Sequence, residues 1–582
     1  MTDVTTQQGG ANQLRKNSLG TGAITFLVVS AAAPLTAVAG GVPLAMLLGN
    51  GTGMPATFLL VTAILLLFAV GYVAMARHIR NAGAFYAYTA QGFGGLAGGA
   101  AALIAILAYA TMQVGLFGML GAATSGFLAS LGLDLPWWLY ALGFVLIVGV
   151  LGYRRVDLSA RILTILVILE YLVVLIIDVA ILGSGGDSGL SLKPFSTEAF
   201  FSGSPAIGLL FGFAAFIGFE ATTIYSEEAR DAHRTVPRAT YISVLLIGVF
   251  YMLTSWLMVN ASGYDKLLPE LQGLSDPTTF LFVTSERYVG AWLSPIMSIL
   301  FITSVFAGVV AFQNGVARYL YVAGREGLLP KGLGVTHASF QSPHVASAVQ
   351  TVIAFLVVGL FAVTGQDPIL ALFSWMTNVG TLGIIVLMAL TAFAIVAFFS
   401  RNPGLEANAL TTKVVPTVAG LILTGVVVTI VRNFSDLAGA TGALAVLLPG
   451  LVLIAAGIAG LNVVTTVTLV VGADLGITGA GHGIDHELER GANVHEAVDH
   501  HQQRLARRWV GAAPLMQVDL QAAHRKVAAA GGAQRLVGVG HHGTVGGRPC
   551  AGLSVPGQTR RGRPGCQNSG DESLPPARRR AA

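Results

Sequence analysis

Twelve long apolar segments dominate this sequence of 582 residues. The hydrocarbon core of a bilayer is about 30 Å thick, and a helix needs about 20 apolar residues to cross it. Because backbone groups in lipid must be satisfied within the protein, segments of this length predict helices. We therefore expect an all-α membrane protein of twelve transmembrane helices. The expected spans lie near 22–47, 54–76, 95–128, 136–152, 158–182, 203–226, 239–261, 290–317, 345–364, 369–399, 414–431 and 439–460.

The composition agrees with a lipid bilayer as the surroundings, since 54% of the residues are hydrophobic and 10% are charged, against about 25% charged in soluble domains. The net charge of +5 arises after residue 461: residues 1–461 hold 19 basic and 19 acidic residues, and residues 462–582 hold 14 and 9. A neutral membrane part with a separate basic tail gives no indication of a nucleic acid partner. Both cysteines, Cys550 and Cys566, lie in that tail, so disulfides are not expected in the spans.

Basic residues alternate between the segments that connect the spans. One set of segments holds fifteen, and the opposite set holds only Lys193, Lys266, Arg287 and Arg432. Because lysine and arginine collect on the cytoplasmic side, we expect a cytoplasmic N-terminal segment, residues 1–21, and a C-terminus on the same side of the cytoplasmic membrane. The N-terminal segment has no short apolar stretch with a cleavage site, so a signal peptide is not expected.

Two spans are interrupted well inside their apolar length. The first interruption is Ser30, Ala31, Ala32, Ala33 and Pro34, and the second, five spans later, is Phe216, Ile217, Gly218, Phe219 and Glu220. Proline lacks a backbone donor and clashes with the preceding turn, while a glycine beside an acid weakens the second helix. A pair of interruptions at matching positions predicts an inverted-repeat transporter with a midplane binding site. Two ordinary helix kinks are the alternative.

Three stretches carry a resemblance to a known family. They are residues 77–88 after span two (RHIRNAGAFYAY), residues 216–220, 227–230 and 234–239 around span six (FIGFE, EEAR, RTVPRA), and residues 314–318 and 324–330 after span eight (NGVAR, GREGLLP). Here the sequence resembles the amino acid-polyamine-organocation (APC) superfamily of permeases, from about residue 18 to 460. The resemblance implies a LeuT-type fold in a transporter domain at 22–461. Repeat one would lie near 22–182, the inverted repeat two near 203–399, and two appended helices near 414–460.

In that fold, spans one, three, six, eight and ten surround the substrate. Half-helix N-termini suit a carboxylate and unwound carbonyls suit an ammonium, so two facing interruptions can hold the backbone of an α-amino acid. The ten residues of the two interruptions are therefore the expected substrate-binding residues, together with Tyr109 in span three. Packing is the alternative role for Tyr109, and closing the helix end is the alternative role for Glu220.

Three residues are candidates for ion coupling: Glu170 in span five, and the hydroxyl pair Thr303 and Ser304 in span eight. A carboxyl in an apolar span is costly when ionised and cheap when protonated, so Glu170 favours the proton as the driving ion. Sodium-coupled relatives of this fold use carbonyls of span one and hydroxyls of span eight, which leaves sodium as the second choice. The alternatives are that Glu170 bonds a neighbouring helix and that the hydroxyls bond back to their own turn.

A neutral or weakly polar amino acid is the expected substrate. Arginine-agmatine exchangers of the superfamily carry a tryptophan two residues before the phenylalanine of their Phe-Ile-Gly motif, and here that position is Ala214. The ring that would stack on a guanidinium is thus missing, although Phe211, Phe213 and Phe216 offer other aromatic faces. The function predicted is secondary-active amino acid transport by alternating access. An amino acid exchanger, a polyamine transporter and a non-transporting amino acid sensor are the alternatives.

Two further regions are candidates for gates. Trp375, Thr377 and Asn378 in span ten suit an outer gate or a bond to a neighbouring helix, and the charged loop at 227–238 suits a cytoplasmic gate or a solvated face. The spans contain no set of residues with the pattern of a catalytic or metal site, so an enzyme is not expected. They contain no filter repeat or ring of like charge either, which argues against a channel.

Residues 462–582 depart from the family pattern and are rich in glycine, alanine, arginine, valine and histidine. This composition predicts a disordered cytoplasmic tail, and a shifted reading frame near residue 461 is another explanation. The stretch from His495 to His500 resembles a metalloprotease helix, but its histidines are five residues apart and not four. No metal site and no cofactor are expected.

Overall fold

The computed structural model describes residues 20–79, 84–154, 160–224, 229–325, 327–340, 342–405, 408–438, 447–452 and 454, without the side chains at 31, 160–163 and 224. All of these residues belong to one compact unit, Met1–Ala513. The second unit, Pro514–Ala582, lies outside the described residues, as does the whole of the tail predicted from residue 462.

Within the described residues, nine helices are long and apolar enough to cross a membrane. Each of them coincides with one of the spans expected from the sequence, and every regular element described is a helix. The long helices are α3 (Met54–Ala76), α5 (Gly95–Ser130), α6 (Trp137–Arg154), α7 (Ala160–Ser184), α11 (Ala232–Ser262), α14 (Ser294–Arg325), α15 (His344–Val363), α16 (Ser374–Arg401) and α17 (Val415–Arg432). Most of the expected twelfth span lies outside the described residues.

Shorter helices connect or extend these spans. They are α4 (Ala84–Phe93), α8 (Thr197–Phe200), α12 (Leu267–Gly273), α13 (Phe280–Tyr288), α18 (Phe434–Ala438) and the π-helical turn η8 (Pro368–Phe373), which leads into α16. Asp367 begins η8, because its carboxylate accepts the backbone N–H groups of Ile369 at 2.8 Å and Leu370 at 2.6 Å. A side-chain acceptor at this position satisfies donors that have no partner within the helix.

Both interruptions predicted from the sequence are present in the fold. Span one consists of α1 (Thr21–Ala31), the π-helical segment η1 (Thr36–Gly41) and α2 (Val42–Leu48), and span six consists of α9 (Pro205–Ala214) and α10 (Ala221–Ile224). Each gap contains a residue in the left-handed region, Ala33 with φ +43° and Gly218 with φ +112°. A right-handed helix cannot continue through such a residue. At Ala33, which has a Cβ, the left-handed conformation costs about 1–2 kcal/mol.

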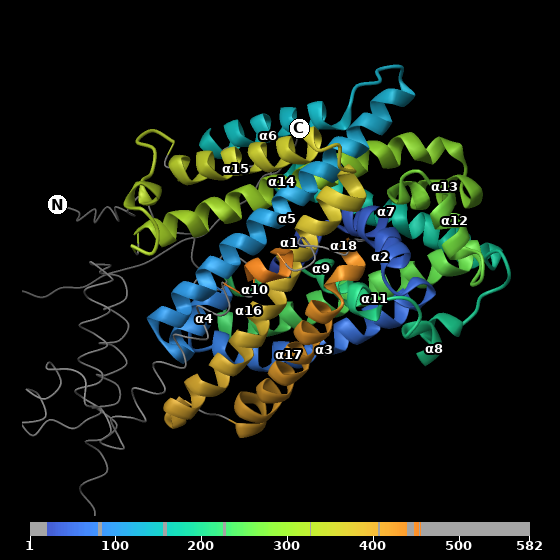
Figure 1. The fold of residues 1–582 in the computed structure, drawn as a ribbon. Coiled ribbons are helices and arrows are strands. Elements are labelled where there is room, and N and C mark those ends of the chain that lie inside the picture. Colours follow the sequence, from blue (N-terminus) through green and yellow to red (C-terminus); the bar gives the residue numbers. More distant parts are fainter. Residues whose placement is uncertain are drawn as a thin grey trace, which may run out of the picture. The chain divides into compact units, whose positions relative to one another are not determined.

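The helices differ in how much protein surrounds them. Buried residues make up 78% of the most apolar window of Pro368–Arg401 and 67% of that of Gly95–Ser130, but only 17% of that of Trp137–Arg154. Helices α5 and α16 therefore form the interior and pack on each other, whereas α6 turns most of its surface outward and runs beside α15 (Figure 1). The outward surface is apolar, as lipid contact requires.

Small residues allow α5 and α16 to approach closely. A Cβ added at Gly115 on α5 would lie 2.7 Å from the Thr377 side chain, and one added at Gly380 on α16 would lie 2.4 Å from the Met112 side chain. Either distance is far below ordinary van der Waals contact, so a larger residue would push the helices apart. Glycine at helix contacts is the usual device for close packing in membranes.

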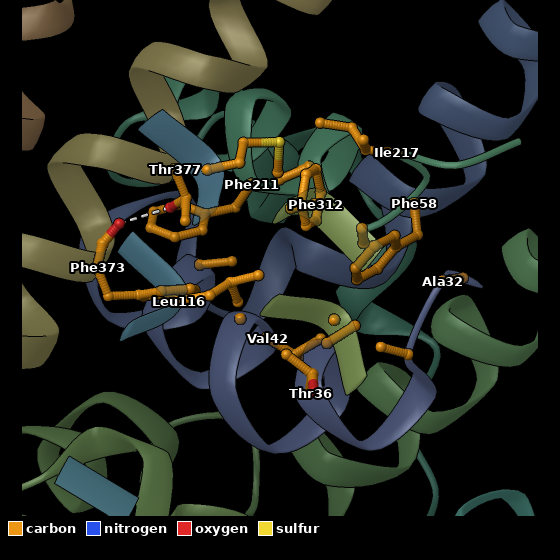
Figure 2. Close-up of a pocket in the computed structure, with 18 residues that line it drawn as sticks. Ala32, Thr36, Val42, Phe58, Leu116, Phe211, Ile217, Phe312, Phe373 and Thr377 are labelled. Carbon is orange, nitrogen blue, oxygen red and sulfur yellow. Dashed lines mark hydrogen bonds between the residues drawn. The ribbon is translucent and has the colours of Figure 1, made fainter. Parts of the chain in front are cut away.

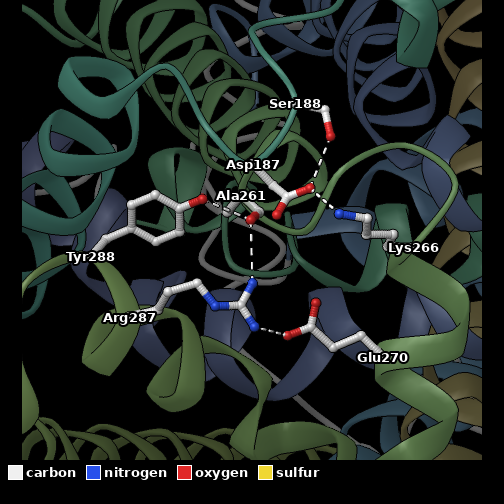
Figure 3. A network of polar contacts seen from close by, with 7 residues as sticks. All are labelled: Asp187, Ser188, Ala261, Lys266, Glu270, Arg287 and Tyr288. Carbon is white, nitrogen blue, oxygen red and sulfur yellow. Dashed lines mark hydrogen bonds and ion pairs between the residues drawn. The ribbon is translucent and has the colours of Figure 1, made fainter.

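Charged residues gather where α11 ends (Figure 3). The Lys266 ammonium donates to Asp187 at 2.6 Å, and this hydrogen bond holds the pKa of Asp187 below its usual value. Arg287 forms an ion pair with Glu270. The backbone carbonyl of Ala261 in the last turn of α11 accepts from the Tyr288 hydroxyl at 2.7 Å and from the Arg287 guanidinium at 3.3 Å. These contacts satisfy a carbonyl that the helix leaves without a partner and attach α13 to the end of α11.

Candidate functional site

A cavity of about 90 Å³ lies between the two interruptions (Figure 2). Span one contributes residues from Ala32 to Ala45, and span six contributes Phe211, Ala214, Ala215 and Ile217. The remaining walls come from α3, α5, α14, and η8 with the start of α16. Six spans, namely one, two, three, six, eight and ten, therefore contribute to this one cavity. A substrate site at this place stays a prediction.

The cavity lining is almost entirely apolar. Among its lining side chains only those of Thr36 and Thr377 carry an oxygen or nitrogen, and none is charged. Both hydroxyls already donate within the protein: Thr377 to the Phe373 carbonyl at 2.6 Å and Thr36 to the Ser304 hydroxyl at 2.9 Å. The two hydroxyls therefore have no proton left for a guest, so its acceptor groups must find donors in the backbone, while its donor groups can also use the hydroxyl lone pairs. The rest of the lining suits an apolar group.

Glu170 on α7 connects the first interruption to α14. One oxygen of its carboxylate accepts the Leu35 N–H at 3.3 Å and the Ser304 hydroxyl at 2.8 Å, and Ser304 in turn accepts from Thr36. The side chain is 2% exposed. The chain Thr36–Ser304–Glu170 therefore joins span one, span eight and span five through one buried acid. Thr303 takes no part in it, because its hydroxyl bonds back to the Leu300 carbonyl at 3.0 Å.

Glu220 closes the second interruption. Its carboxylate accepts the Gly218 N–H at 2.9 Å and a hydrogen bond from the Tyr109 hydroxyl on α5. Both side chains lie beside the cavity and not in its lining, although the Tyr109 ring packs against Phe312, a lining residue, with centroids 5.6 Å apart. Through the Gly218 bond, Glu220 closes the helix end, which was its alternative role in the sequence analysis. A direct role of Glu220 in substrate binding stays a prediction.

Two tyrosines hold the interruptions in a matching way. The Tyr251 hydroxyl on α11, in span seven, donates to the Ala32 carbonyl of span one at 3.1 Å. The Tyr72 hydroxyl on α3, in span two, donates to the Glu220 carbonyl of span six at 3.3 Å. Both tyrosines are fully buried. Each interrupted helix is therefore bound by a tyrosine from the span that follows the other interrupted helix.

The other residues predicted for the site occupy three kinds of position. Ala32, Ala33 and Ile217 line the cavity. Ser30 bonds its own turn through the Phe26 carbonyl at 2.7 Å, and Pro34 is buried in the gap. The rings of Phe216 and Phe219 pack edge-on against Tyr251 and Phe68, with centroids 6.2 and 6.3 Å apart. The Ala31 side chain is outside the described residues.

The two candidate gates differ in what the structure describes. Thr377 lines the cavity, whereas the Asn378 amide donates to the Ser374 carbonyl of its own helix at 2.7 Å. The charged segment at 227–238 is a loop only in part, because residues from Ala232 onward belong to α11, and Glu227 and Glu228 lie outside the described residues. Asp231 and Arg234 form an ion pair at 3.6 Å on a strongly exposed surface, where such a pair contributes little.

Several lining residues were not expected from the sequence. They include Gly41 in span one, Met112 and Leu116 on α5, and Gly308 and Phe312 on α14. Helix α5 is apolar on every side, so no periodic pattern marks the face that turns to the cavity. The available signal was the glycines, which are small enough to leave space.

Comparison with known proteins gives a family and a set of relatives. A family described as amino acid permease matches residues 19–464. The low-affinity putrescine importer PlaP of Escherichia coli (strain K12) is 26% identical over 238 residues, which are 39% of this chain and 50% of that protein. The branched-chain amino acid permease BcaP of Bacillus subtilis (strain 168) is 25% identical over 394 residues, 64% of this chain and 79% of that protein. The chain thus spans only half the length of the putrescine importer.

Among solved structures, a manganese transporter from Eremococcus coleocola has a TM-score of 0.49 and 14% sequence identity, covering 78% of this chain and 98% of that chain. The family match extends over most of the sequence and includes all the residues around the cavity. It confirms the resemblance seen in the motifs, and the family's members are permeases, not enzymes. The chain belongs to the amino acid permease family and is a multi-pass membrane protein.

Proposed function

We propose that this protein carries neutral amino acids across the cytoplasmic membrane by proton-coupled alternating access. The observation that carries the proposal is the apolar cavity between two interrupted helices. Helix ends leave N–H and C=O groups without partners inside the helix, and these groups suit the carboxylate and ammonium of an amino acid. The lining without charged side chains suits a neutral side chain.

The same lining favours an amino acid over a polyamine. A diamine such as putrescine has a cationic group at each end, and a buried cation needs a paired anion. Neither Glu170 nor Glu220 lines the cavity, and each already accepts two hydrogen bonds. The cavity lining therefore offers no anion to pair with either end of a dication, whereas a zwitterionic amino acid brings its own positive and negative charges as a pair.

Glu170 is the proposed coupling group. It bonds span one and span eight at once, so its protonation state acts on two elements that must separate when one helix bundle rocks against the other. A neutral carboxyl in an apolar setting costs far less than a charged one. The hydroxyls of Thr36 and Ser304 also suit a sodium ion, which makes sodium-driven uptake the result that would replace this part of the proposal.

The arrangement of tyrosines supports the inverted repeat. If span one corresponds to span six and span two to span seven, then Tyr72 and Tyr251 occupy equivalent helices and bind equivalent interruptions. We therefore propose twelve spans, with repeats near 22–182 and 203–399, two appended helices near 414–460, and both termini in the cytoplasm. Residues 462–582 are proposed to lie outside the transport machinery.

Uptake into liposomes that contain the purified full-length chain tests the proposal. A pH gradient, acidic outside, should drive accumulation of labelled leucine or alanine, and a sodium gradient at equal pH should not. Competition by arginine and putrescine should be weaker than competition by neutral amino acids. Preferential binding of putrescine, or binding of neutral amino acids without any flux, would show that the function has been assigned wrongly.

A further inference from the structure

Two adjacent glycines in span one differ in what surrounds them. A Cβ added at Gly40 would lie 2.4 Å from the end of the Met119 side chain, so Gly40 serves close packing. A Cβ added at Gly41 would meet no heavy atom within 4 Å. Gly41 lines the cavity, and the open space beyond its Cα is therefore part of the cavity.

The backbone does not explain glycine at position 41. Its φ of −77° and ψ of −43° are ordinary right-handed helical values, which alanine adopts without strain. Glycine in a helix is less stable than alanine by roughly 0.5–1 kcal/mol. The sequence thus keeps a destabilising residue where a methyl group would fit both the backbone and the surrounding atoms.

Gly308 on α14 repeats this pattern on another wall of the cavity. A Cβ there would lie 3.7 Å from the Leu116 side chain, an ordinary contact distance, with no other heavy atom within 4 Å. Gly308 and Leu116 both line the cavity. In both places a methyl group would fit without displacing a neighbouring helix: at Gly41 it would meet no atom within 4 Å, and at Gly308 it would make one ordinary contact, with Leu116 on α5.

We propose that Gly41 and Gly308 determine specificity, because the space they leave holds the branched aliphatic side chain of the substrate and sets its upper size. This inference rests on the proposed amino acid transport and adds to it the substrate class, namely amino acids of the size and shape of valine, isoleucine and leucine. In a cavity of about 90 Å³, one added methyl group removes room for about one methyl group of the guest.

The test compares Gly41→Ala and Gly308→Ala with wild type in liposomes, using labelled alanine and competition by unlabelled leucine, valine and alanine. One methylene in a hydrophobic pocket is worth about 10–200-fold in discrimination. We expect each variant to lower the affinity for leucine relative to alanine by roughly tenfold or more. Gly143→Ala on α6 is the matched control, because its Cβ would also meet nothing within 4 Å and Gly143 does not line the cavity.

Two further measurements separate specificity from a general structural effect. Thermal unfolding of both variants should occur at or above the wild-type temperature, since alanine is the better helix former. Adding Leu116→Ala to Gly308→Ala should restore leucine binding, because it reopens the space that the new methyl group occupies.

An unchanged leucine-to-alanine ratio in both variants, in a wild type that transports neutral amino acids, would overturn this inference alone. A wild type that binds no neutral amino acid would overturn the proposed function, and this inference with it. An equal change in Gly143→Ala would also count against the role of the cavity glycines.

Discussion

The Ser304 hydroxyl on α14 donates a hydrogen bond of 2.8 Å to the Glu170 carboxylate on α7, and both side chains are buried. The two residues are 134 positions apart in the sequence, and the same carboxylate oxygen also accepts the Leu35 N–H of the interrupted span one. Both hydrogen bonds therefore form together only when α7, α14 and span one hold these relative positions. Any motion of span one relative to α14 must break part of this arrangement, which makes it a sensitive place to test coupling.

Replacing Glu170 by glutamine should abolish accumulation driven by a pH gradient. Glutamine keeps the shape and an oxygen acceptor for Leu35 and Ser304, but it cannot gain or lose a proton. Exchange of labelled for unlabelled substrate at equal pH should continue, because exchange needs no net proton movement. Uptake into liposomes with and without the gradient measures both quantities. Full pH-driven accumulation by Glu170→Gln would exclude this residue as the coupling group.

Replacing Ser304 by alanine should slow pH-driven uptake by roughly ten- to a hundredfold, since a hydrogen bond to the ionised form of the Glu170 carboxyl is worth about 1.5–3 kcal/mol. The neighbouring Thr303 is the matched control. Its hydroxyl bonds only its own turn, so Thr303→Val should leave the uptake rate within about twofold of wild type. If Thr303→Val were the more damaging of the two, Thr303 and not Ser304 would belong to the ion path.

Replacing Tyr251 by phenylalanine should destabilise the protein by about 1–3 kcal/mol, because the Ala32 carbonyl then loses its buried partner. Tyr72→Phe should have a smaller effect, since the Glu220 carbonyl also accepts from the Thr223 hydroxyl at 3.0 Å. Thermal unfolding in detergent measures the difference. Equal and negligible effects would mean that neither tyrosine holds its interruption.

Ala33 should tolerate glycine better than its neighbours do. At φ +43° alanine is strained, and the relief on replacement, about 1–2 kcal/mol, exceeds or balances the extra entropy of glycine in the unfolded chain, about 0.4–1 kcal/mol. Ala33→Gly should therefore unfold at or slightly above the wild-type temperature. Ala37→Gly in η1 is the comparison, and it should lose about 1 kcal/mol. A loss of that size at position 33 would argue against the left-handed conformation.

A chain that ends at Leu475 should transport as well as the full chain. The last residue in the cavity lining is Thr377, and the region from 462 onward has no apolar periodicity for a core of its own. Uptake per molecule in liposomes checks this after the amount of protein in the membrane has been matched. Reduced transport by a truncated chain that inserts normally would assign the tail a role.

The sequence predicted the positions of the helices and of both interruptions for a physical reason. In lipid, a helix is one of the few structures that satisfy all backbone hydrogen bonds, so a long apolar segment predicts a transmembrane helix. Pro34 and Gly218 mark the places where the helical hydrogen bonds are interrupted. The sequence analysis also gave a bond to a neighbouring helix as the alternative role of Glu170. The physical reason is that a buried acid needs a hydrogen-bond partner.

The cavity itself was harder to predict. Phe58 and Met112 lie on helices that are apolar on every side, and only the packing of the helices decides which face meets the cavity. Tyr109 was placed in span three beside the substrate, and the structure directs its hydroxyl to Glu220. A sequence shows that a side chain needs a partner, but the partner depends on contacts between distant spans.

The almost unbroken apolar lining of the cavity has a nutritional consequence. Discrimination between aliphatic guests by shape alone is worth only about 1–3 kcal/mol per methylene, so under the proposed function neutral amino acids of similar size would compete for this protein. The influx of each through it would then follow its abundance in the medium relative to the others. An excess of one such amino acid outside the cell would lower the uptake of the others through this protein, without any change in the protein.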